Sequence, residues 1–238
     1  MKKRIWHDVP NHPELKVGQY VVPNFVSNSV MIHVDDQNTV VVSPGKALLE
    51  NCPIKEQADD IVLHIIMPNG YHFMGVEEWQ KVFPNHKLYA SRDAIQMLSD
   101  KMPSETVNSI HTLEETSPPL PNQYSVLIPP GHRGGDAWLV KQSEQGDTWI
   151  TCDSFLNYDR MSNQPIARFL QKLLSAAPGL KISKVIKYFI LKDRRTFKQW
   201  VLDQLNSSNL TTLIPSHGEV NQSPSLASEL RSLVEKQL

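Results

Sequence analysis

Short apolar runs rich in β-branched residues alternate with polar turns through the first half of the chain. Residues 30–34 and 39–42 are rich in Val, Ile and Thr and are separated by Asp-Asp-Gln-Asn, a pattern that predicts a β-hairpin. Residues 61–66 are apolar apart from one histidine, which is typical of a strand buried on both faces. The same pattern predicts further strands over residues 86–91, 124–130, 136–142, 147–153 and 211–214.

Apolar residues spaced three and four positions apart predict helices among and after these strands. Residues 76–82 and 92–101 show this spacing in the first half, and the chain becomes mainly helical from residue 165 onward. Asp193 is a suitable N-cap for one of the later helices. The later helices are expected over residues 166–177, 182–193, 193–205 and 223–238. Strands and helices mix without a break in composition, so we expect one α/β domain over residues 1–238.

Composition narrows the class of protein. Of the 238 residues, 40% are hydrophobic and 21% are charged, which is ordinary for a globular chain with a sizeable core. The net charge of −1 argues against a general nucleic-acid binder. Two cysteines form no disulfide framework, so we expect a reducing, cytoplasmic setting. We expect neither a secretory signal in the basic N-terminal stretch nor a membrane-spanning segment, because no apolar run is long enough.

Three histidines and one aspartate follow predicted strands. They are His72, His132, Asp153 and His217, each at or just past the end of a strand. Sites in α/β folds are usually built at this edge of a sheet, and imidazole nitrogen with carboxylate oxygen suits zinc. The pattern therefore predicts a metal site. The other histidines are interpreted as surface residues (His7, His12, His86, His111) or as residues of the sheet (His33, His64).

Four segments resemble the metallo-β-lactamase fold, in the same order. "NSVMIHVDDQNTVVVSPG" is similar to its opening hairpin, and "PPGHRGGDAWLV" to its turn with a metal-binding histidine. "WITCDSFLN" is similar to the strand with its bridging aspartate, and "LIPSHGEV" to the strand with its last histidine. The resemblance covers nearly the whole chain and implies a four-layer αββα sandwich.

The chain departs from the H-x-H-x-D-H signature of that family. Met67, Asn69 and Tyr71 stand where two histidines and the aspartate are expected, and only His72 is retained. This loop resembles that of an uncharacterised branch of the superfamily. Of the two metal sites of the family, the one that would use Met67, Asn69 and His132 should be lost or weak, because a thioether and an amide are poor zinc ligands.

The other metal site keeps His72, Asp153 and His217, which the resemblance implies could hold one zinc or iron ion with an open position for water. Such an ion lowers the pKa of its water toward about 7 and creates a nucleophile. Asn69, Tyr71 and His132 are the candidate catalytic residues around it. One hypothesis is a hydrolase with at most one metal ion, acting on a small molecule. The alternative is a catalytically inactive, metal-free protein that acts as a binding or scaffolding protein.

Two further features carry predictions of their own. Cys152 is expected to be a small buried residue rather than a nucleophile. The segment that begins at Lys181 and ends at Arg195 is predicted to form a basic amphipathic helix. Its basic face is either simply solvated or makes surface contact with an anionic membrane or an acidic partner. The sequence indicates no oligomeric state.

Overall fold

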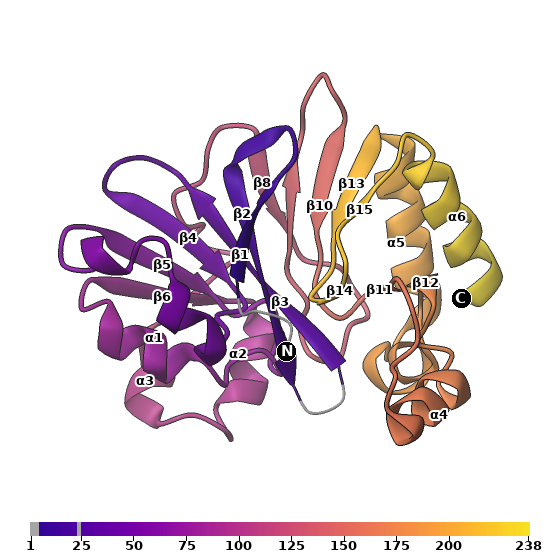
Figure 1. Ribbon diagram of the computed structural model, residues 1–238, viewed down its shortest axis with the longest axis horizontal. Coiled ribbons are helices and arrows are strands. Elements are labelled where there is room, and N and C mark those ends of the chain that lie inside the picture. The colour runs from indigo at the N-terminus through magenta and orange to yellow at the C-terminus, as the bar shows by residue number, and fades with distance from the viewer. Residues whose placement is uncertain (1–4, 23–24) are drawn as a thin grey trace. The chain divides into compact units, whose positions relative to one another are not determined.

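The computed structural model describes residues 5–22 and 25–238, so the first basic residues, on which the expected absence of a signal partly depends, lie outside it. The chain divides into two compact units, residues 1–122 (unit 1) and residues 123–238 (unit 2). Each unit has its own helices and its own hydrophobic core (Figure 1). That the two units make one domain stays a prediction. Among the described residues, no helix is both long and apolar enough to cross a bilayer.

The sheet of unit 1 follows the order of the chain. Its strands are β1 (Ile5–Val9), β2 (His12–Val22), β3 (Phe25–His33), β4 (Asn38–Val42), β5 (Val62–Ile66), β6 (His86–Ala90) and β7 (Ile110–Thr112). The first four are antiparallel, and β4 to β7 are parallel. The predicted hairpin, β3–β4, and the predicted strands β5 and β6 are confirmed. Because β4, β5 and β6 are parallel, their carboxyl ends meet at one edge of the sheet.

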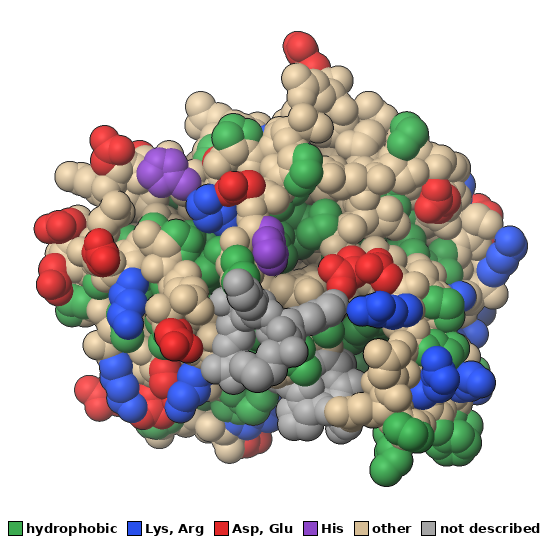
Figure 2. Space-filling model, in the orientation of Figure 1, with side chains coloured by type: hydrophobic (Ala, Val, Ile, Leu, Met, Phe, Trp, Pro, Cys, Tyr) green, Lys and Arg blue, Asp and Glu red, His purple; other side chains and the backbone are tan. Residues whose placement is uncertain are grey.

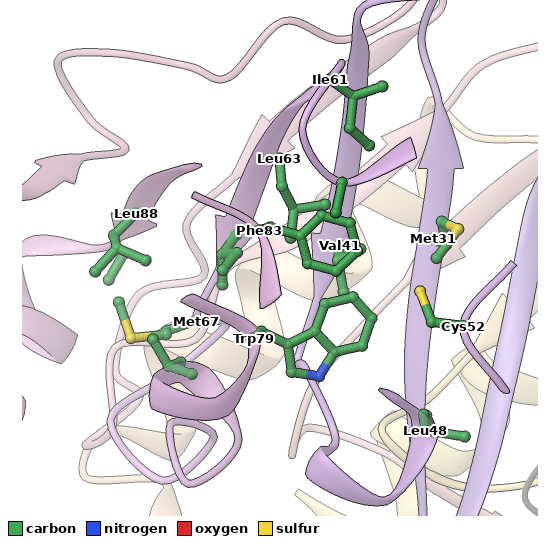
Figure 3. Packing of buried hydrophobic residues seen from close by; sticks show 14 of the residues in the cluster. Met31, Val41, Leu48, Cys52, Ile61, Leu63, Met67, Trp79, Phe83 and Leu88 are labelled. Carbon is green, nitrogen blue, oxygen red and sulfur yellow. The ribbon is translucent and has the colours of Figure 1, made fainter. Parts of the chain in front are cut away.

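The helices of unit 1 are α1 (Val76–Val82), α2 (Arg92–Leu98) and α3 (Ser104–Asn108), with 3-10 helices η1 (Lys46–Asn51) and η2 (Lys55–Gln57). In Figure 3 the ring of Trp79 from α1 and the ring of Phe83, which follows α1 directly, lie against Leu63 and Val41 of the sheet. The two rings stack at 5.6 Å between centroids. This packing fixes α1 on the sheet, so the loop that joins β5 to α1 is held at both of its ends.

Unit 2 contains a mixed sheet in the order β15-β13-β10-β9-β8. These strands are β8 (Tyr124–Leu127), β9 (Trp138–Lys141), β10 (Asp147–Ile150), β13 (Leu210–Ile214) and β15 (Asn221–Gln222). The predicted β9–β10 hairpin is confirmed. Strand β9 runs antiparallel to β8 and β10, and β13 runs parallel to β10. Consequently β8, β10 and β13 point the same way and end at one edge. A smaller group pairs β11 (Leu156–Tyr158) with β12 (Gly179–Lys181) and β14 (His217–Gly218).

The helices of unit 2 are α4 (Pro165–Leu173), the π-helix η3 (Ile186–Ile190), α5 (Arg194–Asn206) and α6 (Leu226–Gln237). Phe197 of α5 and Leu230 of α6 are fully buried in a core with Trp138 of β9. The predicted N-cap of α5 is confirmed, because one Asp193 carboxylate oxygen accepts the backbone N–H of Thr196 at 3.0 Å.

The helix predicted over residues 182–193, and with it the basic amphipathic helix from Lys181 to Arg195, is shorter in the structure than expected. Lys181 ends strand β12, and the helical residues are 184–190, of which Ile186–Ile190 form a π-helix. The backbone N–H of Leu191 donates to the oxygen of Ile186 at 2.9 Å, and Leu191 then forms a β-bridge with His132. The spacing of apolar residues was helical, but pairing with a distant segment ended the helix.

Candidate functional site

The loop between β5 and α1 positions His72 in unit 1. Met67 begins the loop and is fully buried, packed within the core of unit 1. Asn69 is also buried, and its side-chain oxygen accepts the backbone N–H of Tyr71 at 2.8 Å. The backbone oxygen of Asn69 accepts the N–H of His72 at 3.2 Å. These bonds form a tight turn that sets the direction of His72.

A serine at the end of β4 holds the ring of His72. The Ser43 hydroxyl lies 2.7 Å from His72 Nδ1. Ser43 has a left-handed backbone, with φ of 54°, which is uncommon for a residue other than glycine. The Ser29 hydroxyl donates to the backbone oxygen of Ser43 at 2.5 Å, and the N–H of Ser43 donates to the oxygen of Ile66 at 2.9 Å. Hydrogen bonds from Ser29 and to Ile66 therefore fix the backbone of Ser43. The fixed Ser43 hydroxyl in turn orients the ring of His72 through Nδ1.

Two further residues allow this loop to pack as it does. A Cβ atom on Gly75 would lie 1.9 Å from the backbone oxygen of Pro44, so only glycine permits this close approach. The Lys101 ammonium donates to the oxygen of Gly70 at 2.8 Å and lies 4.7 Å from the centroid of the Tyr71 ring. Sequence reasoning missed Ser43 and Lys101, because a lone serine or lysine carries no signal of a distant partner.

Asp153 and His217 meet in unit 2. Asp153 follows β10 and His217 follows β13, two parallel strands that end at the same edge. His217 Nε2 lies 3.1 Å from an Asp153 carboxylate oxygen, and each side chain is 14% exposed. The convergence that the sequence predicted is therefore present for this pair. Both side chains remain reachable from solvent, as a site that admits a ligand requires.

His132 lies in the loop between β8 and β9 and faces a different carboxylate. Its side chain is buried, with Nε2 3.4 Å from an Asp136 oxygen. Neither ring nitrogen has a hydrogen-bond partner among the described residues. The other Asp136 oxygen accepts the Ser154 hydroxyl at 2.6 Å and the Trp138 indole N–H at 3.2 Å. His132 therefore lies beside the Asp136 carboxylate without a hydrogen bond to it, which is uncommon for a buried imidazole.

Asp136 and Ser154 were not among the residues predicted from the sequence. A carboxylate four residues after His132, just before a strand, was the available signal for Asp136. Cys152, by contrast, is fully buried as predicted. Burial raises the pKa of its thiol well above the ordinary value, and the neighbouring charges of Asp153 and Asp136 raise it further. The thiol therefore stays neutral at physiological pH, which excludes a thiolate nucleophile here.

Solved structures share this fold at low sequence identity. A metallo-β-lactamase from Pontibacter korlensis matches with a TM-score of 0.63 and 13% identity, covering 98% of this chain and 99% of that one. The DIM-1 metallo-β-lactamase matches with a TM-score of 0.56 and 13% identity over 98% of this chain and 96% of that one. A mutant flavo di-iron protein from Thermotoga maritima matches with a TM-score of 0.63 and 14% identity over 98% of this chain and 62% of that one.

No protein-family model matches the chain, and no curated protein matches it. TM-scores of 0.63 show a common fold, whereas identities of 13–14% leave the reaction open. The predicted α/β fold is nevertheless confirmed, since the matched structures correspond to nearly all of this sequence. The chain is a protein of the metallo-β-lactamase fold.

Proposed function

We propose that the protein is a metal-dependent hydrolase in which His72, Asp153 and His217 together hold one metal ion. The observation that carries the proposal is the approach of His217 Nε2 to an Asp153 oxygen at 3.1 Å. Zinc binds histidine nitrogen and carboxylate oxygen at about 2.0–2.1 Å, so two such ligands of a tetrahedral ion lie about 3.3 Å apart. The observed separation of the pair suits that spacing.

The setting of His72 supports the same proposal. Histidines that bind metals almost always use their second ring nitrogen in a hydrogen bond that fixes the ring. The hydroxyl of Ser43 has this relation to His72 Nδ1, so His72 would bind through Nε2. Two imidazoles and one carboxylate are a sufficient set for a catalytic zinc and also suit ferrous iron.

A bound ion of this kind lowers the pKa of a water ligand toward about 7 and so supplies a nucleophile at neutral pH. The protein's own groups then have distinct tasks. The Asn69 side-chain oxygen accepts the N–H of Tyr71, and the Asn69 amide is a candidate donor to a developing oxyanion. The Tyr71 hydroxyl is a second such donor. His132, with Asp136 beside it, is the group that can accept or return a proton.

One specific observation favours the alternative of an inactive binding protein. Asp153 and His217 at 3.1 Å are also at the distance of an ordinary hydrogen bond or ion pair, which needs no metal. Met67 fills the core of unit 1 at the position where the family has a histidine ligand. Under this reading the fold is kept for binding, and His72 and His217 can be replaced without loss of function.

Metal content distinguishes the two readings. Protein purified without chelators or an affinity tag is expected to contain about one zinc or iron ion per chain by elemental analysis. Added zinc should raise the free energy of unfolding by about 2.7 kcal/mol when its free concentration is a hundred times the dissociation constant. His72→Ala and His217→Ala should each remove the ion, whereas His111→Ala, at an exposed histidine of β7, should retain it.

Hydrolysis is tested separately with chromogenic esters, phosphodiesters and β-lactams. Activity that disappears with a chelator and returns with zinc or ferrous iron would support the hydrolase. If the protein contains no ion and zinc leaves its unfolding unchanged, the metal site does not exist. If the ion is bound but no substrate class is turned over, the metal site stands and the assignment as a hydrolase fails. A cytoplasmic location also stays a proposal, supported by two buried free cysteines, Cys52 and Cys152.

A further inference from the structure

Positive charge is concentrated in one part of unit 2. Residues 160–195 contain nine of the chain's 24 basic residues and only one of its 25 acidic residues. This stretch therefore carries a net charge of +8, whereas the rest of the chain carries −9. The basic residues are Arg160, Arg168, Lys172, Lys181, Lys184, Lys187, Lys192, Arg194 and Arg195. Such segregation creates a local field that the overall net charge of −1 conceals.

Helix α4 lies within this stretch and presents its apolar side to solvent. Residues 166, 169, 170 and 173 follow the spacing of one helical stripe, and all four are large hydrophobic residues that are exposed. Ile166 is 75% exposed and Phe169 is 64% exposed. The only buried residue of the helix is the small Ala167. An apolar stripe normally faces the core, so its outward direction here requires an explanation.

The turn around the π-helix adds a second exposed apolar group. Tyr188 and Phe189 are 58% and 67% exposed. The N–H of Lys184 donates to the oxygen of Leu174 at 2.8 Å, which ties this segment to the end of α4. Figure 2 shows hydrophobic side chains gathered beside Lys and Arg side chains at lower right, where Figure 1 places α4. The combination of exposed aliphatic and aromatic groups with basic ones thus belongs to a single region of unit 2.

Basic side chains lie beside these apolar groups. Arg168 and Lys172 are exposed on α4, one helical turn apart and next to the apolar stripe. The Arg194 guanidinium lies 5.4 Å from the centroid of the Tyr188 ring, and the Lys187 ammonium lies 5.6 Å from it. An apolar stripe bordered by Lys and Arg is the arrangement by which a helix lies in the surface of an anionic bilayer. The basic groups reach the phosphates while the apolar groups enter the acyl boundary.

We propose that α4 and the π-helical turn form a docking surface for a bilayer that contains anionic lipid. A second copy of the chain is disfavoured as the occupant, because a symmetric dimer through this face would bring two +8 regions together. Single-stranded RNA is disfavoured because the stripe of α4 is mainly aliphatic, whereas RNA recognition uses aromatic stacking. An anionic membrane surface matches both the charge and the aliphatic character. This proposal does not depend on the metal site.

Flotation with vesicles tests the docking surface. The full chain is expected to bind vesicles of phosphatidylcholine with phosphatidylglycerol and not vesicles of phosphatidylcholine alone. Binding should weaken strongly at about 1 M salt, where the screening length is about 3 Å. A Phe169→Trp variant should show a blue-shifted emission on the anionic vesicles that brominated lipid quenches. This readout requires the side chain of residue 169 to enter the bilayer.

Variants separate the apolar and the basic contributions. Phe169→Ser should weaken binding about 10- to 100-fold through lost apolar burial. Arg168→Gln with Lys172→Gln should weaken it about 30-fold, because each basic residue near the surface contributes about fivefold. Val21→Ser, at an exposed apolar residue of β2, is the matched control and should bind normally. Circular dichroism verifies that each variant is folded.

Several outcomes would overturn the proposal. They are equal binding to neutral and anionic vesicles, no binding to either, and binding that survives Phe169→Ser and the double charge variant. Sedimentation velocity that shows a dimer dissolved by Phe169→Ser, without vesicle binding, would assign the surface to a second copy. Binding of single-stranded RNA, without binding of vesicles, would assign it to nucleic acid.

Discussion

Acidification should destabilise the protein through His64, a buried histidine outside the candidate site. His64 lies in β5, where Nδ1 is 3.0 Å from the Tyr89 hydroxyl and Nε2 is 3.0 Å from the Asn38 side-chain oxygen. The Asn38 amide nitrogen already donates to Asp35, so its oxygen can only accept from His64. Nε2 of His64 therefore carries a proton, and because the pKa of the ring is lowered to about 4, the ring is neutral at pH 7 and Nδ1 accepts from the Tyr89 hydroxyl.

Burial lowers the pKa of His64 from 6.5 to about 4, and the charge of Lys87 lowers it further while Asp35 opposes the change. Because the folded pKa is depressed, the unfolded chain takes up the proton first as the pH falls. Stability from this group is fully present above pH 6.5 and is lost between pH 6.5 and pH 4. Between pH 8 and pH 5 the linkage relation gives a loss of about 2 kcal/mol in the free energy of unfolding.

Urea unfolding at several pH values measures this loss. The comparison protein is His64→Gln, which keeps a polar side chain but cannot titrate, and the difference between the two pH profiles isolates His64 from the other ionisable groups. Nuclear magnetic resonance of the imidazole Cε1–H reports the pKa directly. A His64 signal that titrates above pH 6, or parallel pH profiles for the two proteins, would refute the reasoning.

Three further substitutions test the remaining structure. Ser43→Ala should weaken zinc binding about 10- to 100-fold without unfolding the protein, because His72 loses the partner of its Nδ1. Calorimetry measures the zinc affinity, and an unchanged affinity would contradict this role of Ser43. Trp79→Ala should lower the free energy of unfolding by about 3–5 kcal/mol, measured with urea, because it removes a fully buried ring from the core of unit 1. A loss below about 1 kcal/mol would show that the Trp79 ring does not stabilise this core. Asp136→Ala should lower the free energy of unfolding by about 3 kcal/mol, also measured with urea, because the Ser154 hydroxyl and the Trp138 N–H lose a buried acceptor. An unchanged free energy of unfolding would mean that both groups find another partner.

Local patterns predicted most of the elements. Helix α1 occupies residues 76–82 as expected, and α5 begins at its predicted cap, Asp193. Strands β1 and β2 were not predicted, because their sequence is rich in polar residues and they are stabilised by pairing, β1 with β2 and β2 with β3. The segment of residues 182–193 had helical spacing throughout, yet its helical part is limited to residues 184–190, and Leu191 pairs with His132 instead. These misses occur where pairing with a distant segment outweighs local preference.

The sequence by itself determined the order and type of most elements, the fold they resemble and the loops that hold His72, Asp153 and His217. Those properties depend on residues a few positions apart. Only the tertiary structure decided that Ser43 orients His72 from 29 positions away, that Asp136 faces His132, and that the apolar stripe of α4 points to solvent. Helical periodicity in the sequence shows that a helix has an apolar stripe but not whether that stripe faces the core or the solvent. A serine in the sequence likewise does not show which distant group its hydroxyl will contact. Both depend on which distant segments pack together, because packing and hydrogen bonding act through space rather than along the chain.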